Sequence, residues 1–186
     1  MTKNFLPLKG NYRDLIAFKK AECIYDITYY FAHHYLEKGD RTIDQMIQAA
    51  RSGRQNIAEG CSAATTSSET EIKLLNVAKA SLQELLLDYE DYLRVREMEQ
   101  WNVTSEKAVA ARRACSSHND SAYYREAIKV RSDETICNIA ITLIHQADVC
   151  LRQYIERIKK DFLESGGIKE QMYKARVDYR GQQKQG

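Results

Sequence analysis

Between Ile136 and Phe162 an apolar residue recurs every three or four positions without a break. The successive gaps are 4, 3, 4, 4, 3, 4 and 4 residues, which keeps these side chains on one stripe of an α-helix. The pattern predicts a helix from about Asp133 to Ser165 that ends at Gly166-Gly167. An apolar stripe of this length is typical of a helix that is buried along one side of a bundle.

Three earlier segments also carry apolar residues at helical spacing. They run from about Tyr12 to Glu37, from Arg41 to Glu59 and from Ser68 to about Glu99. Gly39 is predicted to end the first of these helices and Asp40 to cap the second. Gly60 is predicted to end the second helix, so that residues 61–67 form a loop. A capping box, Ser68-Glu69-Thr70-Glu71, is predicted to begin the third.

Turn-forming residues are scarce, with one proline and eight glycines in 186 residues. This composition argues against a sandwich, a barrel or another β fold rich in turns. Residues 100–132 are predicted to form one or two short helices. The fold class expected is all-α: an antiparallel four-helix bundle over residues 1–165, with a helical insertion at about 100–132. Residues 166–186 are expected to form a basic, partly mobile tail.

Composition indicates a protein of the cytoplasm. No stretch approaches the roughly 18 apolar residues of a membrane helix, and the first residues carry no apolar run typical of a secretory signal. The five cysteines are an odd number without CxxC spacing, which favours reduced thiols. No glycine-rich phosphate loop, nucleophile elbow or zinc pattern is present, so no cofactor and no catalytic residue are predicted.

The net charge of +2 does not by itself indicate a nucleic-acid-binding protein. The bases are nevertheless segregated, since residues 1–20 and 169–186 each carry five bases against one or two acids. The candidate nucleic-acid contacts are Lys19, Lys20, Arg51, Arg54, Lys169, Lys174, Arg176 and Arg180. Tyr173 and Tyr179 lie among the last of these bases and suit stacking on single-stranded bases. The alternatives are a solubilising tail, and pairing of Arg51 and Arg54 with Glu59 or with acids of the third helix.

A polar stripe follows the second predicted helix, opposite its apolar face. Uncharged hydrogen-bonding residues dominate this stripe, whereas Lys and Glu would dominate a solvated face. It is predicted to form a seam against another helix or another subunit. The residues assigned to this structural or interface motif are Gln48, Ser52, Asn56, Glu59 and Gly60.

The other chemistry-bearing residues favour structural roles. His33 and His34 are adjacent, so on a helix they point about 100° apart and do not ligate one metal ion well. Cys137 and Cys150 fall on or beside an apolar stripe, which favours packing over nucleophilic chemistry. Glu84, Asp88 and Asp91 are predicted to form a charged outer face rather than acid–base pairs. No metal site is predicted.

Two motifs carry a resemblance to a known family: Asn56-Ile57-Ala58-Glu59-Gly60 and Ala80-Ser81-Leu82-Gln83-Glu84-Leu85. In this order and separation they resemble the 23S ribosomal RNA intervening-sequence proteins, a four-helix-bundle family that includes the accessory variability protein of diversity-generating retroelements. Gly53 and Arg54 depart from the family pattern, and the insertion at 100–132 is longer than its usual connection. The resemblance implies an antiparallel bundle that self-associates into a ring, expected to be a pentamer, without known catalytic activity. It also implies nucleic-acid or reverse-transcriptase association in some members.

The leading functional hypothesis is a non-enzymatic, self-associating scaffold whose basic surface contacts RNA or single-stranded DNA. In a ring, the few cations of each subunit would bind the same nucleic acid together, so that weak contacts become useful. The alternative is an adaptor for an enzyme such as a reverse transcriptase, without strong nucleic-acid binding of its own.

Overall fold

The computed structural model describes residues 11–183, and within this range the protein is all-α. Its four long helices are α1 (Ile16–Tyr35), α2 (Arg41–Ala63), α3 (Ser68–Val95) and α6 (Asp133–Ser165). The shorter helices are α4 (Glu106–Ser117), α5 (Ser121–Ala127) and α7 (Ile168–Gln183), with single 3-10 turns at Tyr12–Asp14 and Ile128–Val130. Within the described range no helix combines the length and the apolar run that are needed to span a membrane. The all-α class expected from the sequence is confirmed.

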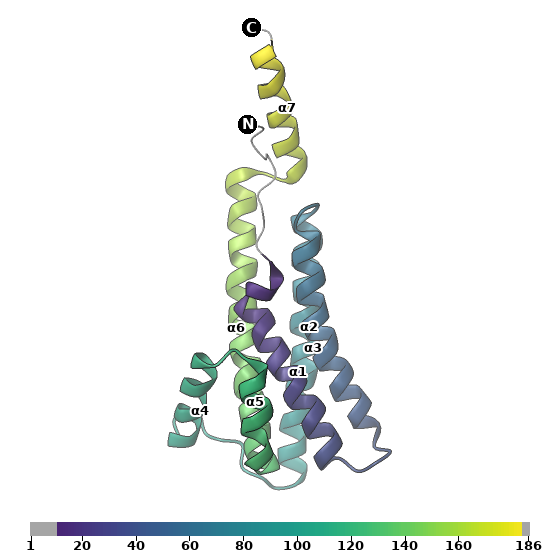
Figure 1. The fold of residues 1–186 in the computed structure, drawn as a ribbon, viewed down its shortest axis with the longest axis vertical. Helices are drawn as coiled ribbons and strands as arrows, with labels where there is room; N and C mark the ends of the chain where they lie inside the picture. The colour runs from purple at the N-terminus through teal and green to yellow at the C-terminus, as the bar shows by residue number, and fades with distance from the viewer. Residues whose placement is uncertain (1–10, 184–186) are drawn as a thin grey trace.

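The four long helices lie along one axis, and consecutive ones run in opposite directions (Figure 1). Helix α1 packs on α2 and α6, and α3 packs on the same two helices. The stripe predicted on α6 is the buried side of that helix, because Ile136, Leu143 and Leu151 have no exposed surface. Phe162 is 48% exposed, since α1 begins well short of this end of α6 (Figure 1).

Helix α2 does not end at Gly60 as predicted but continues to Ala63. Gly60 is buried, and a Cβ atom added there would lie 3.3 Å from the carbonyl oxygen of Glu71. A Cβ atom added at Gly53 would lie 2.8 Å from Cδ2 of Leu82. Both glycines therefore allow α2 and α3 to approach closely, and Gly60 is a packing residue rather than a helix stop.

We expect Gly53→Ala to lower the free energy of unfolding by about 1–2 kcal/mol. The added methyl group meets Leu82, which is 1% exposed and has little room to move. This strain exceeds the gain in helix propensity of about 1 kcal/mol. Urea unfolding followed by circular dichroism measures the change. Gly181→Ala is the matched control, because nothing lies within 4 Å of its added Cβ atom, and it should leave the unfolding midpoint unchanged or slightly raised.

The start of α3 also differs from the prediction. Ser67, not Ser68, is the N-cap, and its Oγ accepts a hydrogen bond from the backbone N–H of Thr70 at 3.1 Å. Glu71 is fully buried and accepts a hydrogen bond of 2.8 Å from the Tyr154 hydroxyl of α6. The physical reason is register, because Glu71 lies on the same face of α3 as the buried Leu75. Because α3 packs against α6, the Glu71 side chain bonds to Tyr154 instead of capping the start of α3.

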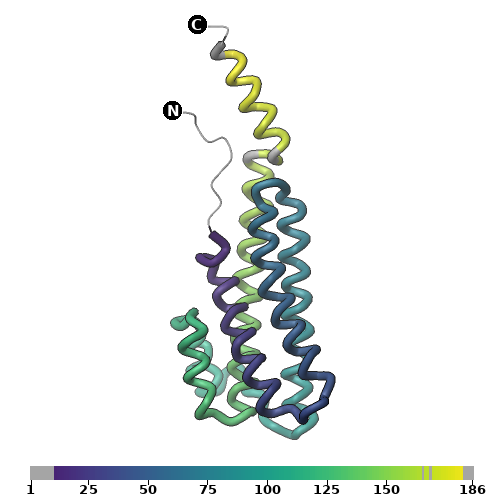
Figure 2. The backbone as a smooth tube through the Cα atoms, turned by 45° about the vertical axis from the view of Figure 1, so that its right-hand side comes forward, coloured from purple at the N-terminus to yellow at the C-terminus, as the bar shows by residue number. Residues whose placement is uncertain are grey.

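The insertion forms the two short helices expected: α4 packs on α6, and α5 packs on α1. Residues 168–183 of the tail form helix α7, which the sequence pattern did not predict. Gly166 has φ of 73°, a left-handed conformation that ends α6 and redirects the chain. Helix α7 projects beyond the ends of α2 and α3 (Figures 1 and 2). The end of the predicted mobile tail, Lys184–Gly186, lies outside the described residues, as do residues 1–10 of the predicted bundle domain.

Candidate nucleic-acid interface

Three bases and one tyrosine lie on a single face of α7. Lys169, Tyr173, Arg176 and Arg180 are separated by 4, 3 and 4 residues, so at about 100° per residue they fall within an arc of roughly 60°. We call these four residues the α7 face. All four side chains are exposed, and Tyr173 is 72% exposed. In the described part of the chain, no carboxylate lies within 4.0 Å of the three cations.

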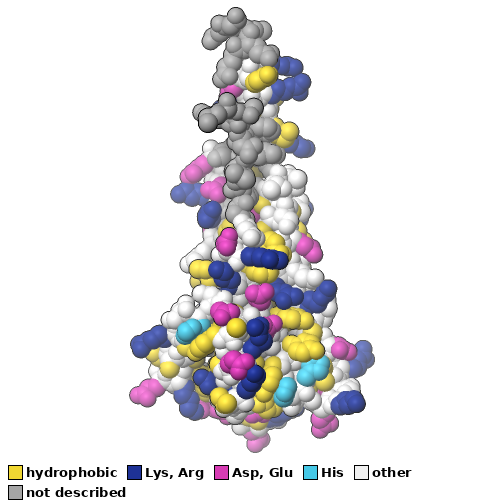
Figure 3. Space-filling model, in the orientation of Figure 1, with side chains coloured by type: hydrophobic (Ala, Val, Ile, Leu, Met, Phe, Trp, Pro, Cys, Tyr) yellow, Lys and Arg dark blue, Asp and Glu magenta, His cyan; other side chains and the backbone are white. Residues whose placement is uncertain are grey.

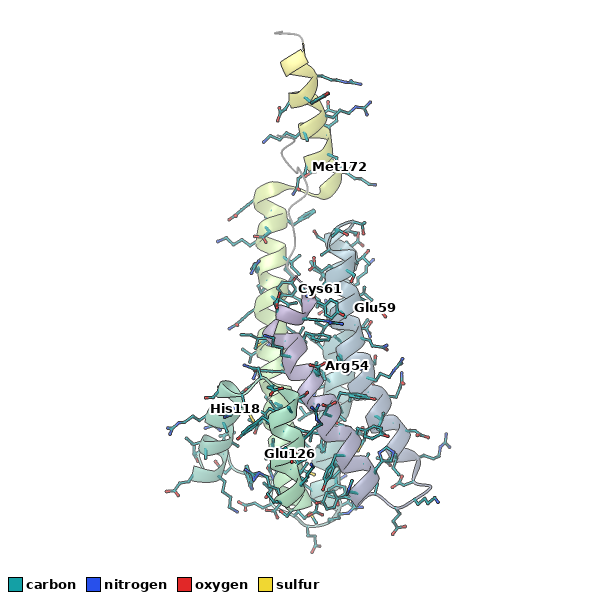
Figure 4. The ribbon with its side chains drawn as sticks, in the orientation of Figure 1. Arg54, Glu59, Cys61, His118, Glu126 and Met172 are labelled. Atoms are coloured by element: carbon teal, nitrogen blue, oxygen red, sulfur yellow. The ribbon has the colours of Figure 1, made fainter. Side chains whose placement is uncertain are left out.

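The position of α7 leaves this face accessible. Side chains extend from α7 with no helix beside them, starting from Met172 near its first turn (Figure 4). Lys and Arg side chains stand along one edge of this helix (Figure 3). Lys174 falls on another side of the helix, about 130° from the centre of the α7 face. The arrangement can therefore neutralise phosphates with three cations and stack one aromatic ring on a base.

Lys19 and Lys20, both predicted as candidate nucleic-acid contacts, have different environments, and the prediction is wrong for Lys20. Lys20 is 4% exposed, and its Nζ donates to the carbonyl oxygen of Cys115 at 2.9 Å and to Oε1 of Gln146 at 2.8 Å. Burial lowers the pKa of the Lys20 ammonium. Lys20 is therefore not available to a nucleic acid. Lys19 is half-buried at the edge of a cleft of about 970 Å³.

Arg54 lines the same cleft as Lys19. Its guanidinium lies 4.3 Å from the ring centroid of Tyr25 in α1, a cation–π contact (Figure 4). Arg51 is exposed on the neighbouring surface of α2. Within residues 11–183 neither arginine lies within 4.0 Å of a carboxylate, so pairing with Glu59 is not found there. Arg54 is thus partly used in packing, whereas Arg51 stays open to a ligand.

The polar stripe of α2 makes contacts inside the chain. Ser52 Oγ lies 2.9 Å from Ser81 Oγ of α3, and Asn56 Nδ2 donates to the Ser52 carbonyl oxygen at 2.9 Å. Gln48 and Glu59 are exposed at the two ends of the stripe. The centre of the stripe is therefore a seam between α2 and α3. A contact with another subunit stays a prediction.

Acidic residues line a groove along this seam. Asp44 of α2 and Glu84 and Asp88 of α3 lie on its walls together with Ser52 and Ser81, and its volume is about 640 Å³. We call this the α2–α3 groove. Burial, with smaller contributions from Asp91 and Glu84, raises the pKa of the Asp88 carboxyl. The sequence predicted the acids of α3 as an outer face but not their meeting with Asp44 across the groove.

The two adjacent histidines are hydrogen-bonded within α1. Nδ1 of His33 lies 2.8 Å from the carbonyl oxygen of Tyr29, and Nδ1 of His34 lies 2.9 Å from that of Tyr30. A carbonyl oxygen only accepts, so each Nδ1 donates. Among the described residues no group of three or more His, Cys, Asp or Glu side chains is placed to hold a metal ion.

The structure also contains a pocket that the sequence did not predict. It has a volume of about 610 Å³ and is lined by residues of α1, α4, α6 and the connection from α3 to α4. Its lining includes Lys20, Trp101 and Cys150. Cys150 is half-buried, whereas Cys137 is packed in the core as predicted. These residues are far apart in the sequence, so their spacing does not predict a pocket. The one hint in the sequence is that the chain's single tryptophan lies in the insertion.

Compared with models of protein families, with curated proteins and with solved structures, the chain matches none of them. The resemblance to the intervening-sequence proteins therefore stays an expectation that depends on the two motifs. The candidate interface depends on the geometry described above.

Proposed function

We propose that this chain is a non-enzymatic, self-associating scaffold that contacts single-stranded nucleic acid, RNA or DNA, through α7. The observation that carries the proposal is the α7 face, in which Lys169, Arg176 and Arg180 share one side of the helix with the exposed ring of Tyr173. Cations without a nearby carboxylate bind phosphates by releasing the counterions of the nucleic acid. A tyrosine between them stacks on a base, and it does so without preference for sequence.

We further propose that α1, α2, α3 and α6 form the antiparallel four-helix bundle of the intervening-sequence family, with α4 and α5 as its insertion. The closed order of contacts, from α1 through α2, α3 and α6 back to α1, supports this arrangement. Self-association would bring several α7 faces together on one particle. Contacts that are weak one at a time would then act jointly, with an effective concentration in the millimolar range.

The acidic α2–α3 groove supports the second candidate function. It carries Asp44, Glu84 and Asp88 and is separate from the basic α7 face. The same groove would suit a basic surface of another protein, which favours an adaptor for an enzyme such as a reverse transcriptase as the second candidate.

Fluorescence anisotropy of a labelled 20-nucleotide oligo(U) tests the proposal. Affinity should fall as salt rises from about 50 to about 200 mM, with a slope of log K on log salt of about −2 for three cations. A duplex of the same length should bind more weakly, because its bases are not open to Tyr173. Absence of binding to single-stranded RNA and DNA at about 50 mM salt would overturn the proposal and leave the adaptor ahead.

Replacing Tyr173 separates stacking from charge. We expect Tyr173→Ala to weaken oligo(U) binding by about 5- to 150-fold, since stacking on one base contributes about 1–3 kcal/mol. Tyr173→Phe should retain affinity within about twofold, because the ring is kept. Tyr179→Ala is the control, since Tyr179 is also exposed but lies about 120° from Tyr173 around the helix. Equal losses in Tyr173→Ala and Tyr179→Ala would contradict the assignment of the face.

A further inference from the structure

The unpredicted pocket has the size and lining of a small-molecule site. Its volume of about 610 Å³ lies within the usual range for such sites, about 300–1,000 Å³. Apolar atoms form most of its surface, and Ile141 of α6 and Val103 of the connection to α4 contribute to it. Lys20 is buried in the wall, and Arg112 and His145 lie at exposed positions around it. No Asp or Glu side chain lines it.

Among the side chains that the structure describes, two polar atoms are buried without a partner, Nε1 of Trp101 and Oδ1 of Asn119. Both residues line the pocket. The position of Trp101 is fixed, because its backbone N–H donates to Oδ1 of Asn138 at 2.8 Å. A buried donor without an acceptor costs about 1–3 kcal/mol.

Lys20 adds a buried positive charge to the same wall. Both of its acceptors, the Cys115 carbonyl oxygen and Gln146 Oε1, are neutral. In the described chain no carboxylate lies within 4.0 Å of its Nζ. Gln146 is itself held by hydrogen bonds from Nε2 to the Arg112 carbonyl oxygen and to Ser116 Oγ, at 3.0 and 3.1 Å. The third N–H of the ammonium is left for another acceptor, and a buried charge without a counterion is costly.

We propose that this pocket binds a small apolar molecule that carries a carboxylate. Its acid group is recognised by the ammonium of Lys20, and its hydrocarbon part lies against the apolar surface to which Trp101 contributes. The absence of acids from the lining favours an anion over a neutral or cationic ligand of the same shape. The site lies away from α7 and does not depend on the proposed nucleic-acid function.

Trp101 makes the test direct, because it is the only tryptophan and its fluorescence reports on the pocket. The probes are octanoate, octanol and octylammonium, which share a chain length and differ in charge. We expect saturable fluorescence changes, with octanoate bound at least about tenfold more tightly than either of the others. Equal affinities for octanoate and octanol would overturn the assignment of Lys20, and no saturable change with octanoate would overturn the site.

Two neighbouring lysines provide a matched pair of variants. Lys20→Met removes the buried charge with little change in volume and should reduce the preference for octanoate over octanol to within about twofold. Lys19→Met makes the same change in net charge at a residue that does not line this pocket, and it should keep the preference. A preference that persists in folded Lys20→Met would contradict the proposal.

A second readout uses the wild-type protein alone and does not depend on how the variant folds. Cys150 lines the pocket and is the one cysteine of five that is not buried. Octanoate should therefore slow its alkylation by iodoacetamide at least about threefold at saturation, measured by mass spectrometry of the modified peptide. Octanol at the same concentration should slow it less. An unchanged rate in saturating octanoate would place the ligand elsewhere and overturn the proposal.

Discussion

Replacing Lys169, Arg176 and Arg180 together by glutamine should lower the affinity for single-stranded RNA at least about tenfold at about 100 mM salt. The three cations share one exposed face of α7 and have no carboxylate within 4.0 Å in the described chain, so each is available to a phosphate. The slope of log K on log salt should become flatter by about 2, since each phosphate contact on a single strand contributes about 0.7. Fluorescence anisotropy at several salt concentrations gives both quantities.

A matched triple variant controls for net charge. Arg157, Lys159 and Lys160 of α6 are also exposed, but each lies within 4.0 Å of an acid on the same helix: Asp161, Glu156 and Glu164. Replacing these three bases by glutamine makes the same change in net charge and should alter affinity less than about threefold. Equal losses in the two triple variants would mean that α7 has no special role.

Stability should fall steeply in alkali because thiols and phenols are buried in the core. Burial raises the pKa of the Cys23 thiol to about 12, and it raises the pKa of Cys137, Tyr89 and Tyr124 as well. The folded protein keeps these groups neutral, whereas the unfolded chain ionises them near pH 8.5 for Cys and 10 for Tyr. Their stabilisation is therefore complete below about pH 8.5 and is lost as pH rises toward the raised pKa values.

We expect the free energy of unfolding to drop by at least about 4 kcal/mol between pH 8 and 10.5, since each such group contributes about 1.4 kcal/mol per pH unit. Lys20 acts in the opposite direction, because its lowered pKa makes stability rise with pH until the unfolded lysine loses its proton, but it is a single group. Urea unfolding with reductant present, followed by circular dichroism, measures the drop. Cys23→Ala should flatten the pH dependence. A free energy constant within about 1 kcal/mol up to pH 10.5 would contradict this account of the core.

The long helices were predictable because their apolar spacing is local information. The stripe from Ile136 to Ile158 became the buried side of α6, and the N-cap at Asp40 formed as expected. The predictions of helix ends and caps were wrong where packing between helices determines the role of a residue. Gly60 is a residue type that often ends a helix, but here it lies inside α2 at the contact with α3. Glu71 has the spacing of a capping box, but the register of α3 directs it toward Tyr154.

The candidate sites also include features that follow from local spacing and features that depend on distant residues. The alignment of Lys169, Arg176 and Arg180 follows from their spacing once the segment is helical, but no helix was predicted there. The burial of Lys20 was not predictable, because its acceptors belong to Cys115 and Gln146, which are 95 and 126 residues away. The pocket around Trp101 also requires segments from across the chain.

Light scattering after size exclusion, with and without short single-stranded RNA, tests the central proposal most directly. The account predicts a mass that is a multiple of 21.5 kDa, near five subunits for the expected ring. It also predicts an increase on adding RNA at about 50 mM salt that is lost at higher salt. A mass of 21.5 kDa at every protein concentration, with no increase on adding RNA, would contradict both self-association and nucleic-acid binding.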